Sequence, residues 1–164
     1  VTYYNPVIEE VIVSEAKEEL KRADHSIYVT LKYTRTVDVI KNTLNRLISI
    51  FNTIIWALLE DAKEKKLIAT VPKSPSLKSS LLAKTYPEDK ELSKFISFYT
   101  FLRDVSNAKH AKREEYRRHV ALVADLKNRT AEIDIDNLGT CEIVVLQFFD
   151  YAREFIEGKP EEEF

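Results

Sequence analysis

One wide apolar stripe constrains the fold of this chain more than any other feature. From Val37 to Leu58, apolar residues recur at alternating spacings of three and four, the period of one helix face. A second apolar row, through Ile48 and Ile55, runs beside the first. A stripe of this width must be covered by more than one neighbour. We therefore expect a helix from residue 37 to about Lys66 at the centre of the core.

Other segments show the same period and have recognisable helix ends. Asn5-Pro6 is a favourable start for the first helix, and Asp134 or Asp136 caps the last helix, which stops before Gly158. Polar breaks at 34–36, 71–76 and 127–130 separate the segments, and they favour a compact bundle over one long coiled coil. The expected helices span 6–32, 37–66, 75–84, 88–125 and 134–157.

Glycine is scarce, with only Gly139 and Gly158 in the chain, which argues against β architectures built on tight turns. The prediction is therefore an all-α fold, a helical bundle of four long helices plus one short helix. We expect a single domain over residues 1–164, in which residues 158–164 form an acidic tail.

Composition narrows the possible functions. The single cysteine, Cys141, allows no internal disulfide and offers no metal-ligand set, so we expect a cytoplasmic protein with no metal and no cofactor. No apolar run reaches the roughly 18 residues of a membrane span, so no membrane partner is expected. The net charge of −2 argues against broad, charge-driven nucleic-acid binding but leaves room for a local basic patch.

The residues best suited to catalysis or binding lie in the segment 88–125, whose first half is apolar and whose middle is rich in Arg, Lys and His. On an ideal helix, one narrow face would carry Arg103, Asn107, His110, Glu114 and Arg117. The core stripe of the same helix would carry Leu102, Val105, Tyr116, Val120 and Val123. Upstream on the polar face lie three apolar residues, Leu92, Ile96 and Tyr99. We expect them to be shielded from water, either by the 75–84 helix or by a second copy of the chain.

An arginine and a histidine on one face suit phosphodiester cleavage without a metal. His110 can move a proton near neutral pH, and Arg103 can hold a phosphate as negative charge builds up in the transition state. Asn107 can donate to a phosphate or orient the histidine. Together with Arg113 and Arg117, it is a candidate substrate-binding residue.

The spacing of Arg103-Asp104, five further residues and His110 resembles the Arg-x(4–6)-His motif of HEPN-domain proteins. The resemblance implies a homodimeric, metal-independent endoribonuclease whose two motifs meet at the active site, with RNA as the substrate. In that case Arg103 would bind phosphate and His110 would be the general acid and base. Asp104 would be the polar residue that often follows the arginine in this motif. Many such proteins are toxins or defence nucleases that act beside a nucleotidyltransferase partner.

The same residues also allow other interpretations. Arg113 and His119 form a second match, facing another way. The charged face also suits a non-catalytic interaction protein that dimerises or binds a partner through residues 92–117. Nucleotide binding without cleavage is a third possibility. The aromatic residues of 95–101 fit either a core or base stacking.

Overall fold

The fold combines a helical bundle with a small sheet. It was analysed as a computed structural model that describes residues 12–158, so the predicted helix start at Asn5-Pro6 and most of the acidic tail lie outside the described residues. In chain order the elements are η1 Ile12–Ala16, α2 Lys17–His25, η2 Ser26–Thr30, α3 Leu31–Tyr33, α4 Val37–Glu64, α5 Pro75–Thr85, α6 Lys90–Asn107, β1 Lys109–Arg113, β2 Ala121–Leu126, β3 Arg129–Ile133 and α7 Ile135–Glu157.

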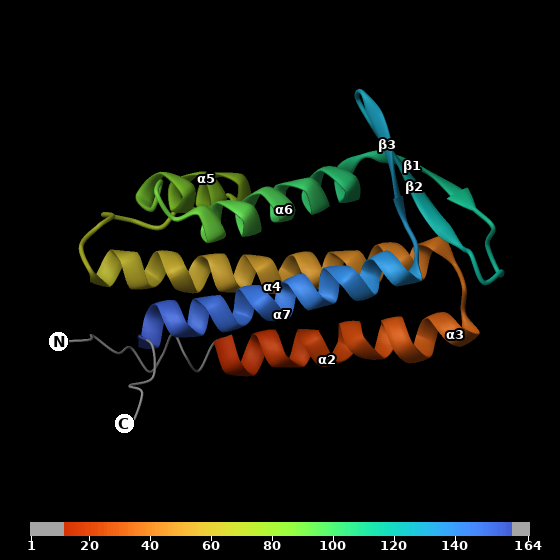
Figure 1. The fold of residues 1–164 in the computed structure, drawn as a ribbon, viewed down its shortest axis with the longest axis horizontal. Helices are drawn as coiled ribbons and strands as arrows, with labels where there is room; N and C mark the ends of the chain where they lie inside the picture. The colour runs from red at the N-terminus through yellow and green to blue at the C-terminus, as the bar shows by residue number, and fades with distance from the viewer. Residues whose placement is uncertain (1–11, 159–164) are drawn as a thin grey trace.

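The elements lie in layers (Figure 1). In that view α5 and α6 lie above α4 and α7, α2 and α3 lie below them, and the sheet stands at one end of the bundle. The strands pair antiparallel in the order β1-β2-β3. The protein is therefore α+β, and the prediction of an all-α fold is wrong.

Helix α4 is the centre of the core, as the width of its apolar stripe predicts. It contacts α2, α5, α6 and α7, so it is covered on several sides. Its start is fixed by the N-cap Thr36, whose side chain accepts a hydrogen bond from the Val39 N–H at 3.3 Å. Midway along α4, the ring of Phe51 lies 5.7 Å from that of Tyr99 on α6 and 5.4 Å from that of Phe148 on α7.

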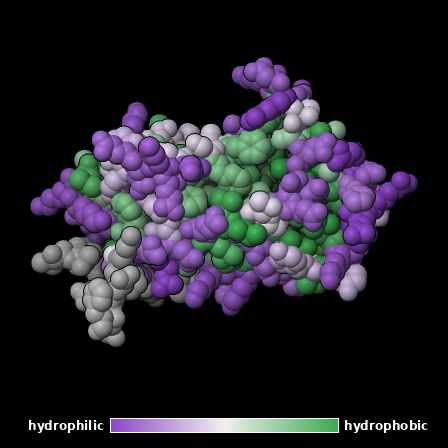
Figure 2. Space-filling view, viewed as in Figure 1, coloured by the Kyte–Doolittle hydropathy of each residue, from purple (hydrophilic) through white to green (hydrophobic). Residues whose placement is uncertain are grey.

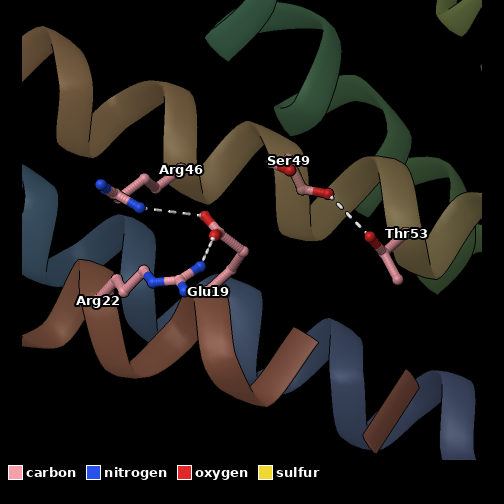
Figure 3. A network of polar contacts seen from close by, with 5 residues as sticks. All are labelled: Glu19, Arg22, Arg46, Ser49 and Thr53. Atoms are coloured by element: carbon pink, nitrogen blue, oxygen red, sulfur yellow. Dashed lines mark hydrogen bonds and ion pairs between the residues drawn. The ribbon is translucent and has the colours of Figure 1, made fainter. Parts of the chain in front are cut away.

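The first helical stretch is continuous from η1 to α3, with two wider π-helical turns at η1 and η2. The second of these turns holds the β-branched residues Val29 and Thr30. A charged network joins this stretch to α4 (Figure 3). Glu19 accepts a hydrogen bond from Arg22 at 2.7 Å and lies 3.6 Å from the guanidinium of Arg46.

The predicted helix 88–125 is wrong beyond its first half. Helix α6 ends at Asn107, and Ala108 takes an extended conformation with ψ 156°. β2 follows as the middle strand, and its neighbours Ala121 and Leu122 are both buried although they point to opposite faces. The apolar run Val120–Ala124 therefore has no clear alternation, and periodicity cannot distinguish such a run from a buried helix.

The apolar side of α6 is covered by its own chain. Leu92, Ile96 and Tyr99 are all buried, and α6 contacts both α4 and α5. The cover expected for these residues is therefore intramolecular, and they offer no surface to a second copy.

The last helix has well-defined ends. Asp134, not Asp136, is the N-cap of α7: its carboxylate accepts from the Asn137 N–H at 2.8 Å, while the Asn137 side chain accepts from the Asp134 N–H at 3.2 Å. Gly158 follows the helix with φ 83°, a conformation that favours glycine. Within residues 12–158, no helix is both long enough and apolar enough to cross a membrane.

A carboxyl pair between α2 and α7 makes stability depend on pH. Glu142 is only 7% exposed, and burial together with its hydrogen bond to Asp24 raises its pKa from 4.5 to about 7. The unfolded chain ionises this group near pH 4.5, whereas the folded chain resists ionisation up to about pH 7. The folded state therefore loses stability as pH rises through this window.

We predict that Glu142→Gln is more stable than the wild type at pH 8, by roughly 1–3 kcal/mol, because it removes the cost of a buried charge. Urea unfolding at pH 5 and pH 8 measures the difference, which should shrink toward pH 5. Glu154→Gln, an exposed site on the same helix, is the control. An advantage of equal size at both pH values would contradict the assignment.

Candidate functional site

The predicted site residues lie on two different elements. Arg103 and Asn107 belong to α6, but His110 belongs to β1, and Arg117 lies in the loop between β1 and β2. The single helical face that was expected to carry them does not exist, because the helix ends before His110. Any convergence of Arg103 and His110 must come from the packing of α6 and β1 on a common neighbour.

Arg103 lies on the α4 side of α6. Its guanidinium carbon is 5.7 Å from the ring centroid of Tyr99, and the Tyr99 hydroxyl donates a hydrogen bond to Asn52 on α4. Burial raises the pKa of Tyr99, while the Arg103 guanidinium beside it acts in the opposite direction. No carboxylate of residues 12–158 forms an ion pair with Arg103, so its charge remains available to a bound anion.

His110 lies on the inner face of the sheet. It pairs directly with Ala124, and Ala124 pairs with Ala131, so the three residues share one face. Ala124 is fully buried in the main core, which identifies this face as the one toward the bundle. His110 is accordingly half-buried, although β1 is an edge strand.

Two contacts on either side of His110 join this part of the chain to α4. Before it, the Ser106 hydroxyl donates to Asn45 of α4 at 2.6 Å. After it, the Lys112 ammonium lies 3.9 Å from Asp38 of α4, and Lys112 shares the inner face with His110. We call the row of Arg103, Ser106, His110 and Lys112 along this helix the α4 seam. From Asp38 to Asn52, the seam follows about 21 Å of α4, at 1.5 Å per residue.

The other candidate site residues differ in whether they already pair with another side chain. Arg113 is held by Glu132 on the outer face of the sheet through two hydrogen bonds, one of them 2.9 Å. This pairing raises the pKa of Arg113 and lowers that of Glu132. Arg117 is exposed. Asn107 lies one turn beyond Arg103 and borders an open cavity of about 590 Å³ that Asp104 and Arg129 also line.

The two residues of the second Arg/His match have different neighbours. Arg113 pairs with Glu132, whereas His119 borders a mixed-charge cavity of about 250 Å³. The other residues that line this cavity are Arg35, Arg118, Asp134, Ile135 and Asp136.

The loop between β1 and β2 is fixed to the start of α4. The Tyr116 N–H donates to the Arg35 carbonyl at 2.7 Å, and Glu115 accepts from the Val37 N–H at 3.0 Å. Tyr116 was expected in the core stripe of a helix, but it lies in this loop with its side chain 78% exposed. Sequence reasoning missed it because Glu114 and Tyr116 adopt left-handed conformations, φ 52° and 67°, without a glycine to signal the turn.

A groove lies between α6 and α7, formed by three cavities that share lining residues. Its floor carries Phe95, Phe98 and Phe101, one helical stripe of α6. In Figure 2, hydrophobic residues gather across the middle of this face between hydrophilic margins. Four acidic and three basic residues line the groove; they are Glu91, Glu132, Asp150 and Glu154, and Lys90, Lys94 and Arg129.

Comparison with protein-family models, curated proteins and solved structures found no match to this chain. Among residues 12–158, no group of three or more His, Cys, Asp or Glu side chains is placed to hold a metal ion.

We predict that Glu115→Ala lowers the free energy of unfolding by about 1–2 kcal/mol, because the buried Val37 N–H at the start of α4 loses a charged acceptor. Chemical denaturation measures the loss, and limited proteolysis should cut the β1–β2 loop faster. Glu114→Ala is the control in the same loop, since the Glu114 side chain is exposed. Equal losses from both substitutions would show that Glu115 does not anchor the loop.

Proposed function

We propose that this chain is a HEPN-like, metal-independent endoribonuclease in which Arg103 binds the scissile phosphate and His110 transfers the proton. The observation that carries the proposal is the α4 seam, along which both side chains are half-buried and neither is paired with a carboxylate of the described residues. The neighbouring Lys112 and Arg113 are both engaged with acidic residues. The two residues of the motif are thus both available to a substrate.

The chemistry follows from these two side chains. The His110 imidazole accepts the proton of a ribose 2′-hydroxyl, whose oxygen then attacks the adjacent phosphorus. The bond to the 5′-oxygen breaks, which leaves a 2′,3′-cyclic phosphate on one fragment and a hydroxyl on the other. Arg103 stabilises the charge that builds up on the non-bridging oxygens.

A homodimer completes the reaction. The leaving 5′-oxygen needs a proton, and a second copy of His110, brought close by dimerisation, would supply it. This arrangement is the one that the resemblance to HEPN domains implies, as are a nucleotidyltransferase partner and a role in the cytoplasm. The buried free thiol of Cys141, with its pKa raised to about 11 by burial, suits a reducing compartment.

The proposal predicts that purified protein cuts labelled RNA in EDTA and that Arg103→Ala and His110→Ala each lower the rate about 100-fold or more. Matched controls are Arg22→Ala and His25→Ala on α2, on the other side of α4 from α6. These controls should cut like the wild type. Circular dichroism melts check that every variant is folded.

Two outcomes would contradict the proposal. If Arg103→Ala and His110→Ala cut as fast as the wild type, the cutting comes from another site or a contaminant. If no preparation cuts any RNA, the chain is not a nuclease under these conditions, and the second candidate function gains weight.

A non-catalytic interaction protein is that second candidate, and the α6–α7 groove is the observation that favours it. The groove has an aromatic floor, and acidic side chains outnumber basic ones along it. Ile143 and Leu146 of α7 are 56% and 40% exposed. An apolar floor with an acidic excess suits the apolar face of a basic amphipathic helix.

This candidate predicts that a designed Leu/Lys amphipathic helix of about 18 residues binds the protein more tightly than a Leu/Glu helix of the same pattern. Fluorescence anisotropy measures both affinities. Phe98→Ser and a double reversal, Asp150→Lys with Glu154→Lys, should each weaken Leu/Lys binding about tenfold. Leu77→Ser, an exposed apolar site on α5, is the control. Equal binding by all variants would rule out the groove as the docking site.

A further inference from the structure

The β1–β2 loop holds an aromatic side chain outward against the preference of its backbone. Tyr116 has φ 67°, a left-handed conformation that costs a non-glycine residue about 1 kcal/mol or more. Glycine or asparagine would occupy this position at lower cost if the loop were only a connection. Here a bulky ring occupies it and is 78% exposed.

Two hydrogen bonds from adjacent residues at the loop tip stabilise the left-handed conformation. The Tyr116 N–H is bound to the Arg35 carbonyl, and the adjacent Glu115 is bound to the Val37 N–H. The Arg35 carbonyl and the Val37 N–H both belong to the α3–α4 corner, at the start of the central helix. The ring is therefore presented from a fixed backbone.

The segment around Tyr116 is rich in basic residues, although the chain as a whole is acidic. Residues 109–119 contain five Lys or Arg and two Glu, whereas the whole chain has a net charge of −2. Lys112 and Arg113 are engaged in ion pairs, but Arg117 and Arg118, which follow Tyr116 directly, are exposed and pair with no carboxylate of residues 12–158. An exposed aromatic ring thus lies beside two available guanidinium groups.

We propose that Tyr116 is a stacking platform for one unpaired nucleobase and that Arg117 and Arg118 hold the phosphates on either side of it. Stacking on an aromatic ring tolerates every base, and arginines bind the backbone, so the subsite selects single-stranded over double-stranded RNA without reading sequence. This inference rests on the proposed function for RNA as the substrate class. It adds a requirement for single-stranded RNA and one binding residue, Tyr116, outside the Arg103/His110 pair.

The test is a binding assay in which cleavage is chemically blocked. A fluorescein-labelled 12-nucleotide 2′-O-methyl RNA lacks the attacking hydroxyl, so the wild-type protein can be used as it is. Stacking contributes about 5- to 100-fold per base, and Tyr116→Ala should weaken binding within that range. Tyr116→Trp should retain binding, and Tyr28→Ala, a 54% exposed tyrosine on η2, should not change it.

Two further readouts separate stacking from charge and from loop damage. Tyr116→Gly relieves the left-handed strain, so it should lose affinity while the protein becomes no less stable. The salt dependence should be the same in Tyr116→Ala as in the wild type, whereas Arg117→Ala with Arg118→Ala should lower the slope by about 1.4. Binding to a duplex of the same sequence should not depend on Tyr116.

Wild-type affinity for the single strand after Tyr116→Ala would overturn the inference, and so would an equal loss of duplex binding. Equally tight, Tyr116-dependent binding of poly-glutamate would identify an acidic protein as the partner instead. The absence of any RNA binding would overturn it as well. Tyr116-dependent binding without cleavage of ordinary RNA would support this subsite and contradict the nuclease, so the two proposals can fail separately.

Discussion

Burial of α4 is the constraint on which the rest of the structure depends. A 28-residue helix with apolar side chains over most of its circumference is stable in water only if other elements surround it. Four helices do so, and the ring of Phe51 touches aromatic rings from both α6 and α7. Because α6 and α7 each pack on α4 more extensively than on one another, a groove remains between them. The same packing, of α6 and β1 along α4, forms the α4 seam.

The sheet depends on α4 as well. Its middle strand packs on α4 and α6, and its first loop is tied to the start of α4 through Glu115 and Tyr116. Glu115 provides an acceptor to the Val37 N–H, one of the helix donors that has no partner within the helix. The loop gains a fixed position in return. This reciprocal contact explains how a loop without glycine sustains two left-handed residues.

The two candidate surfaces differ in charge because different elements line them. Basic side chains are concentrated on β1 and its loop, where the α4 seam and Tyr116 lie, so an anionic ligand is favoured there. The α6–α7 groove carries an acidic excess over an aromatic floor and favours a basic, amphipathic ligand. A phosphodiester and a helical peptide would thus be directed to different parts of the molecule.

The sequence by itself determined the helices whose periodicity is long and whose ends carry caps. The α4 stripe, the connector before residue 75, a capping aspartate at 134 or 136 and the Gly158 stop are local signals, and α4, α5 and α7 were found where these signals predict them. Tertiary structure decided residues 108–133: the apolar start of β2 is buried on both faces, and only the pairing of this strand with β1 and β3 distinguishes it from a buried helix. For the same reason the placement of Arg103 on α6 and His110 on β1 could not be derived from helical spacing. The left-handed turn that exposes Tyr116 is stabilised by contacts from residues about 80 positions away, which no local pattern encodes.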